Sequence, residues 1–160
     1  MIKLKSLILE KNQGLWNWYK QQLPNWPDYV IKDLFFVKLK STTDAIEKKA
    51  HIDTIKKVYP NLKWKFEKLS LTFDSFDRNT KILMKNRDMG KSNPFQVPDD
   101  EKRHQTQLSL LQKRGISKQP IIVIKKSDGY ELWEGWHRTL QYLQHFPNGF
   151  TCPAWVGYID

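Results

Sequence analysis

The run Ile121-Ile122-Val123-Ile124 limits the folds open to this chain more than any other feature. Four β-branched residues in succession favour a strand over a helix. A strand without a polar face has to be covered on both faces, as in the middle of a sheet. Pro120 stands directly before the run, where a strand can begin. We therefore expect a sheet built around residues 121–124, with other parts of the chain packed on both of its faces.

The residues after this run predict the rest of a small sheet. Ser127-Asp128-Gly129 is typical of a hairpin turn, and a second strand follows over Tyr130–Trp133. Gly135 then precedes a helix that we expect from about Trp136 to Gln144, and Pro153–Ile159 predicts a closing strand.

The earlier part of the chain reads mainly as helices that end at proline or glycine. One apolar alternation interrupts them at Trp64–Phe73, where a slip of one residue near Lys68 suggests a strand with a bulge. The expected helices are Leu15–Leu23, Pro27–Phe36, Thr42 to about Tyr59, a helix capped by Asp74 or Ser75 that reaches about Lys85, and one from Asp99 or Asp100 to Arg114.

These elements predict an α+β fold, a small mixed sheet with packed helices and a mainly helical N-terminal extension. We expect residues 1–92, the helical region with the first strand, and residues 93–160, the core, to form one compact unit. The 160 residues suffice for a single hydrophobic core.

Composition narrows the class of protein further. Aromatic residues make up 13% of the chain, which argues against intrinsic disorder. No apolar run approaches the roughly 20 residues of a membrane span, and the first ten residues do not read as a signal peptide. Cys152 is the single cysteine, so no intrachain disulfide can form. We expect a cytoplasmic protein without a membrane partner.

The chain is basic, with a formal net charge of +10 and a pI near 9.6. Residues 102–126 hold seven Lys or Arg and no acidic residue, whereas Arg138 is the one Lys or Arg in residues 127–160. Such a surface is an electrostatic footprint for phosphate, on a nucleotide or on a nucleic acid, but it is also common on ordinary solvated surfaces.

The segment from Trp133 to Thr139 is the clearest candidate site. It reads Trp-Glu-Gly-Trp-His-Arg-Thr at the junction between a predicted strand and a predicted helix. Gly135 allows a tight turn and a close approach to a ligand, and the first amides of a helix favour an anion. Arg138 and His137 add side-chain donors to this phosphate cradle. A purely structural alternative is that Arg138 pairs with Glu134 while Trp136 packs.

Four short motifs stand in order along residues 93–143. They are Asn93-Pro94-Phe95-Gln96, Gly115 followed by the strand from Pro120 to Val123, the hairpin Asp128-Gly129-Tyr130, and the box Gly135-Trp136-His137-Arg138. In this order and spacing they resemble the ParB N-terminal/sulfiredoxin-like superfamily, in particular stand-alone, phage-type ParB-like domains. Residues 1–92 show no such resemblance.

The resemblance implies a ParB/sulfiredoxin-like core that binds a nucleoside triphosphate, ATP or CTP, with Mg²⁺. Members of that superfamily include CTP-dependent DNA clamps, ATP-using sulfiredoxins and small-molecule kinases. In these proteins the G-x-x-R box holds the nucleotide phosphates. Gly135 and Arg138 would take that role here, with His137 and Thr139 beside them. Trp136 stands where sulfiredoxins carry their catalytic cysteine, so sulfinate repair is not expected; it would stack on the nucleotide or fill the site. The resemblance also implies a bacterium or a phage-infected host cell as the source.

Further residues complete the expected site. Glu134 would hold Mg²⁺ or act as a base, with His137 as an acid or base, in hydrolysis or phosphoryl transfer. Alternatively, Glu134 is the ion-pair partner of Arg138. Arg103 and His104, on the preceding helix, would face the cradle as a basic residue does in sulfiredoxin-like proteins, or would lie on a solvated helix face.

Two other functions remain open from the sequence. One is a nucleic-acid-binding protein or ParB-like nuclease, in which basic residues track the phosphate backbone; they are Lys102, Arg103, Lys113, Arg114 and Lys118. The other is a catalytically inactive protein that binds a partner, with Trp136 filling the pocket. The sequence does not indicate an oligomeric state.

Overall fold

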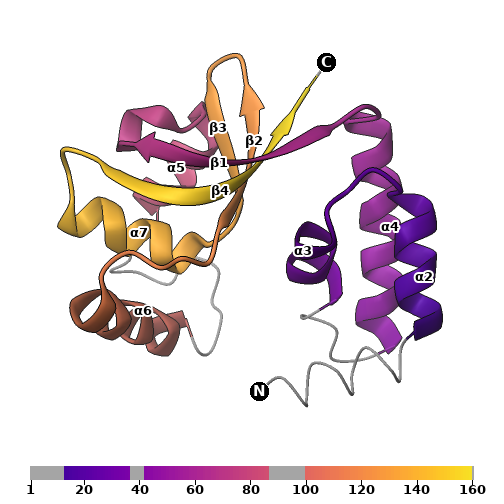
Figure 1. The fold of residues 1–160 in the computed structure, drawn as a ribbon, viewed down its shortest axis with the longest axis horizontal. Helices are drawn as coiled ribbons and strands as arrows, with labels where there is room; N and C mark the ends of the chain where they lie inside the picture. The colour runs from indigo at the N-terminus through magenta and orange to yellow at the C-terminus, as the bar shows by residue number, and fades with distance from the viewer. Residues whose placement is uncertain (1–12, 37–41, 87–99, 160) are drawn as a thin grey trace. The chain divides into compact units, whose positions relative to one another are not determined.

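A computed structural model of the chain describes residues 13–36, 42–86 and 100–159 (Figure 1). The chain divides into two compact units, residues 1–63 and 64–160. This division differs from the expected one: it falls between Lys63 and Trp64 rather than after residue 92, and it separates two units where one was expected. The first strand and the helix after it belong with the sheet because the core of the second unit needs their side chains.

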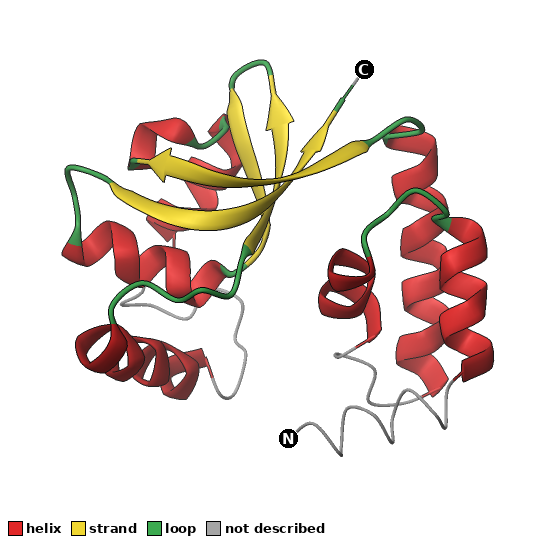
Figure 2. Cartoon of the chain, in the orientation of Figure 1, coloured by secondary structure: helices red, strands yellow, loops and turns green. Residues whose placement is uncertain are grey.

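The described part of the first unit is helical (Figure 2). Phe35 is its packing centre: its ring lies 5.7 Å from that of Tyr19 and 6.3 Å from that of Trp26. Lys20 and Asp28 form an ion pair at 2.7 Å. The elements are α2 (Gln13–Gln22), α3 (Asp28–Ile31), a π-helical segment (Lys32–Phe36) and α4 (Thr42–Val58).

The second unit is a four-stranded mixed sheet with helices, which confirms the α+β class. The strand order is β1-β4-β2-β3; β2 pairs parallel with β4 and antiparallel with β3. The strands are β1 (Lys63–Leu71), β2 (Ile121–Lys126), β3 (Gly129–Glu134) and β4 (Phe150–Tyr158), and the helices are a 3₁₀ turn (Phe73–Ser75), α5 (Arg78–Asn86), α6 (Asp100–Arg114) and α7 (Trp136–His145).

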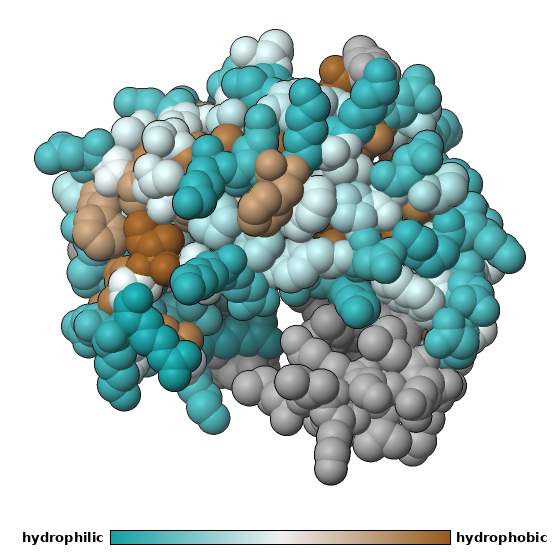
Figure 3. Space-filling view, in the orientation of Figure 1, coloured by the Kyte–Doolittle hydropathy of each residue, from teal (hydrophilic) through white to brown (hydrophobic). Residues whose placement is uncertain are grey.

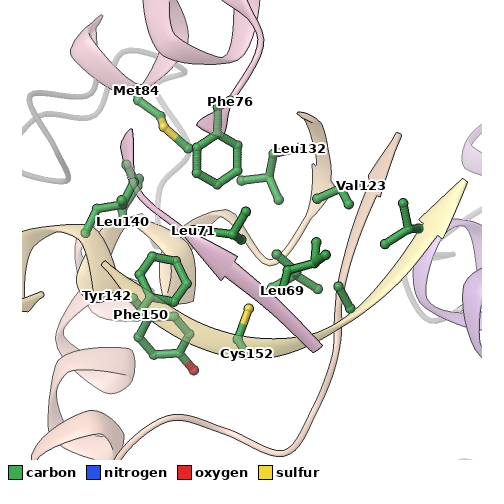
Figure 4. Packing of buried hydrophobic residues seen from close by; sticks show 14 of the residues in the cluster. Leu69, Leu71, Phe76, Met84, Val123, Leu132, Leu140, Tyr142, Phe150 and Cys152 are labelled. Atoms are coloured by element: carbon green, nitrogen blue, oxygen red, sulfur yellow. The ribbon is translucent and has the colours of Figure 1, made fainter. Parts of the chain in front are cut away.

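One face of the sheet carries the main core, which α5, α6 and α7 complete (Figure 4). Phe76 and Met84 pack against this core, and so do Leu140 and Tyr142 of α7. We call the face of the sheet that carries this core the inner face. Ile121 to Ile124 are at most 1% exposed, which confirms that the central strand is covered on both faces.

Two local expectations need correction. The apolar slip in β1 marks a change of face: Leu69 and Leu71 lie in the inner core, while the ring of Trp64 packs against Trp133 outside that core. The helix expected from Asp74 or Ser75 begins at Arg78 instead. Asp77 caps it, because the Asp77 Oδ1 accepts a 2.9 Å hydrogen bond from the Thr80 amide.

Candidate functional site

The turn between β3 and α7 has the geometry that its glycine predicts. Gly135 has φ = 94°, in the left-handed region, and α7 starts at the next residue. A Cβ at this position would lie 2.7 Å from Ile121 Cγ2 and 3.2 Å from Arg138 Nη2. The first hydrogen bond of α7 runs from the Thr139 amide to the Gly135 carbonyl oxygen at 2.9 Å. Only glycine fits this position without strain.

Arg138 does not extend from this turn toward solvent. Its side chain is buried, 8% exposed, and it donates from Nη1 to the Gln119 carbonyl oxygen at 2.8 Å and from Nη2 to the Pro120 carbonyl oxygen at 3.2 Å. These two carbonyls belong to the segment just before β2. In this structure the guanidinium fastens α7 to the start of the central strand, which is a third role beside the phosphate grip and the Glu134 pairing considered from the sequence.

A pocket of about 300 Å³ lies beside the same helix start, between α6 and α7. It brings together two of the expected site residues, Arg103 and His137. The residues that line it are Lys102, Arg103, Thr106, Gln107 and His137. The helical spacing of 102, 103, 106 and 107 could have identified this face of α6, since residues three and four apart lie on one side of a helix.

The pocket lining is cationic. Lys102 and Arg103 are exposed, and His137 is half-buried in the first turn of α7. Every lining residue that the structure describes is basic or neutral. The N-terminal end of a helix adds a partial positive charge within its first turn, where His137 lies. An anion entering this pocket would therefore meet attraction from both helices.

The other expected residues whose side chains the structure describes are not among the residues that line the pocket. Trp136 packs against the inner core. Glu134 pairs across the sheet with Ile122, and Thr139 is fully buried, with no hydrogen-bond partner for its Oγ1 in the described part of the chain. His104 belongs to α6, but its side chain lies outside the described residues, as does the whole segment 93–96.

Nothing in the described ranges forms a ready metal centre: no three His, Cys, Asp or Glu side chains there are grouped closely enough to hold an ion. Burial raises the pKa of the Cys152 thiol to about 11, with a smaller opposing effect of Arg138. Within those same ranges no helix has both the length and the apolar character to cross a membrane.

The fold and the pocket together define a mixed α+β protein with a cationic pocket at the start of a helix. Comparison with protein-family models, with curated protein sequences and with solved structures found no match. The resemblance to the ParB N-terminal/sulfiredoxin-like superfamily and the site residues expected from it stay predictions.

Proposed function

We propose that this protein binds the phosphate groups of a nucleotide in the pocket between α6 and the first turn of α7. One observation carries the proposal: Lys102 and Arg103 from one helix and His137 from another line the same pocket. Basic side chains that converge beside a helix N-terminus are the usual chemistry of phosphate recognition. Arg103 and His137 are also two of the residues that the resemblance assigns to nucleotide binding.

The size of the pocket fits this ligand class. At about 300 Å³ it is at the small end of small-molecule sites, which span about 300–1,000 Å³. That volume suits a di- or triphosphate chain, with the sugar and base extending outside. ATP and CTP with Mg²⁺ are the candidates that the resemblance supplies.

Hydrolysis or phosphoryl transfer is the reaction that this proposal includes. Catalysis of that kind relies mainly on positioning and on neutralising phosphate charge, and Lys102 and Arg103 would supply the neutralising charge. His137 is the candidate proton-transfer group because it lines the pocket. Glu134 would take part only by holding Mg²⁺ from outside the lining.

Calorimetric titration with ATP, CTP and GTP, with and without Mg²⁺, tests binding. The variant Lys102→Gln/Arg103→Gln removes two charges from the pocket. The matched control Lys113→Gln/Arg114→Gln removes two exposed charges from the last turn of the same helix. We expect the pocket variant to lose at least tenfold in affinity while the control stays within about threefold of the parent.

Two results would contradict the proposal. The first is the absence of binding to any nucleotide at millimolar concentration. The second is an equal loss of affinity in both double variants, which would show that charge anywhere on α6 suffices. That second result would favour the nucleic-acid-binding alternative, whose affinity falls steeply as salt increases. Release of phosphate in the same samples, measured with and without His137→Ala, tests the reaction.

A further inference from the structure

The sheet face opposite the main core carries an aromatic layer that the pocket does not explain. We call this the outer face. Trp64 and Phe66 stand on β1, Trp155 on β4 and Trp133 on β3. The rings of Phe66 and Trp155 are 5.4 Å apart at 68°, and those of Trp64 and Trp133 are 6.2 Å apart at 64°.

These rings lie over a second buried layer of the sheet. A Cβ on Gly157 would come within 2.7 Å of Ile124 Cδ1 and within 3.2 Å of the Trp64 ring, so the indole covers the sheet at this glycine. Ile122, the register partner of Trp155, is fully buried. The aromatic layer is therefore held in place by the sheet beneath it, which makes it a preformed surface.

Part of this layer remains accessible. Phe66 is 55% exposed, and Trp155 beside it is half-buried. Figure 3 views the molecule with β1 and β4 in front, and pale and teal side chains surround the few strongly hydrophobic ones over these strands. An exposed aromatic pair within polar surroundings differs from the continuous apolar patch of a permanent protein interface.

One exposed lysine of β1 accompanies these aromatic residues on the outer face. β1 is an edge strand, and its exposed Lys68, two residues after Phe66, lies on the same face of the strand as Phe66. Lys65 lies on the other face, where its Nζ is 5.4 Å from the centre of the Tyr158 ring. The chain as a whole carries +10. An exposed aromatic pair beside a lysine suits a flexible polyanion, whose base can stack on the rings while a neighbouring phosphate meets the cation.

We propose that the outer face binds single-stranded nucleic acid, with a base stacking on Phe66 and Trp155 and a backbone phosphate meeting Lys68 of β1. Stacking on aromatic side chains is tolerant of sequence, so the site would recognise single strands without selecting a base. A duplex would bind poorly, because its bases stack on each other. This site is separate from the nucleotide pocket and does not depend on it.

Binding of a fluorescein-labelled twenty-nucleotide oligo(dT) to the full chain tests the proposal, with anisotropy for affinity and tryptophan fluorescence for stacking. We expect binding at low salt, with quenching of the tryptophan signal. Phe66→Ser should weaken affinity at least fivefold, and Phe66→Trp should restore it. Ile82→Ser is the matched control: this side chain is 45% exposed on α5, away from the outer face, and its loss should change nothing.

Several outcomes would overturn the proposal. They are no binding of oligo(dT) at 50 mM salt, equal affinity of Phe66→Ser and the parent, or equal binding of a duplex of the same length without quenching. A monomer–dimer shift in sedimentation that Phe66→Ser abolishes, without oligo(dT) binding, would assign the face to a second copy of this chain. Lys102→Gln/Arg103→Gln should leave the quenching intact, so failure here is distinguishable from failure of the nucleotide proposal.

Discussion

The contribution of the buried Arg138 side chain to stability depends on its hydrogen-bond partners. Its guanidinium is almost fully removed from water, which is costly unless the N–H groups are bonded. The carbonyl oxygens of Gln119 and Pro120 supply two of those bonds, at 2.8 Å and 3.2 Å. In return, carbonyls that precede β2 gain a donor. The residue thus connects the start of α7 to the start of the central strand.

Arg138→Met tests this structural role. The thioether keeps much of the aliphatic stem but leaves both carbonyls without this donor. We expect a loss of about 2–3 kcal/mol in the free energy of unfolding, measured by urea denaturation, because charge-assisted hydrogen bonds contribute about 1.5–3 kcal/mol. Nucleotide affinity, measured at a temperature where the variant is folded, should fall less than in Lys102→Gln/Arg103→Gln. The opposite order of affinities would return Arg138 to the phosphate-binding role.

A comparison of Gly135 with Gly115 separates two energetic costs of adding a methyl group, backbone strain and steric overlap. Both have positive φ, +94° and +70°, but the space around Gly115 is open, whereas a Cβ at Gly135 would meet Ile121 Cγ2 at 2.7 Å. We expect Gly115→Ala to cost about 1 kcal/mol, from backbone strain alone. Gly135→Ala should cost at least about 2 kcal/mol, since overpacking adds about 1–3 kcal/mol. Equal urea midpoints for the two variants would contradict the close packing at Gly135.

At the scale of single elements, β4 holds the one thiol of the chain in the inner core. Cys152 is 2% exposed, and burial raises its pKa from 9.0 to about 11. The folded state therefore favours the neutral thiol. The stability from this preference is fully present below pH 9 and is lost as pH rises from 9 to 11.

Two measurements check the thiol of β4. The stability difference between the parent and Cys152→Ala should shrink by about 1–2 kcal/mol between pH 9 and pH 11. A disulfide reagent at pH 8 should react slowly with the native protein and rapidly in urea, because the thiolate is the reactive form. Rapid reaction without denaturant would mean that β4 opens locally.

The elements of the last third of the chain follow closely from the sequence, and those before it follow less well. Strand β2 and its hairpin could be predicted because each of their sequence signals indicates a single local structure. These signals are a proline, an unbroken apolar run and Gly129. In contrast, Asp74, Ser75 and Asp77 can all cap a helix, and tertiary contacts select Asp77: its Oδ2 also bonds to Lys126 Nζ at 3.3 Å. The apolar residues of β1 lie on both faces of the sheet. When they are all assigned to one face, the slip in their spacing looks like a bulge.

The candidate site was only partly predictable for a related reason. Glycine at residue 135 fixes a local backbone shape, so the turn could be predicted from the residue type. The partners of Arg138 are main-chain carbonyls, which carry no signature in the sequence. The pocket depends on how α6 packs on α7, and the sequence alone relates Arg103 to His137 only through the family resemblance.

At the scale of the whole molecule, the division after Lys63 has a consequence for folding. The second unit contains all four strands and every member of the inner core. A domain of about 100 residues with its own core is large enough to fold alone. The aromatic layer of the outer face and the pocket between α6 and α7 also belong to this unit.

A fragment of residues 61–160 should therefore fold without the helical unit, because β1 brings Leu69 and Leu71 into the core and no buried residue of the inner cluster comes from residues 1–60. We expect a cooperative urea transition and a native-like circular dichroism spectrum. A fragment of residues 93–160, which begins at the boundary expected from the sequence, lacks β1 and α5. It should fail to show such a transition, because Phe76 and Met84 would be missing from the core. If both fragments unfold without cooperativity, the inner core needs the first 60 residues, and the two units are not independent in folding.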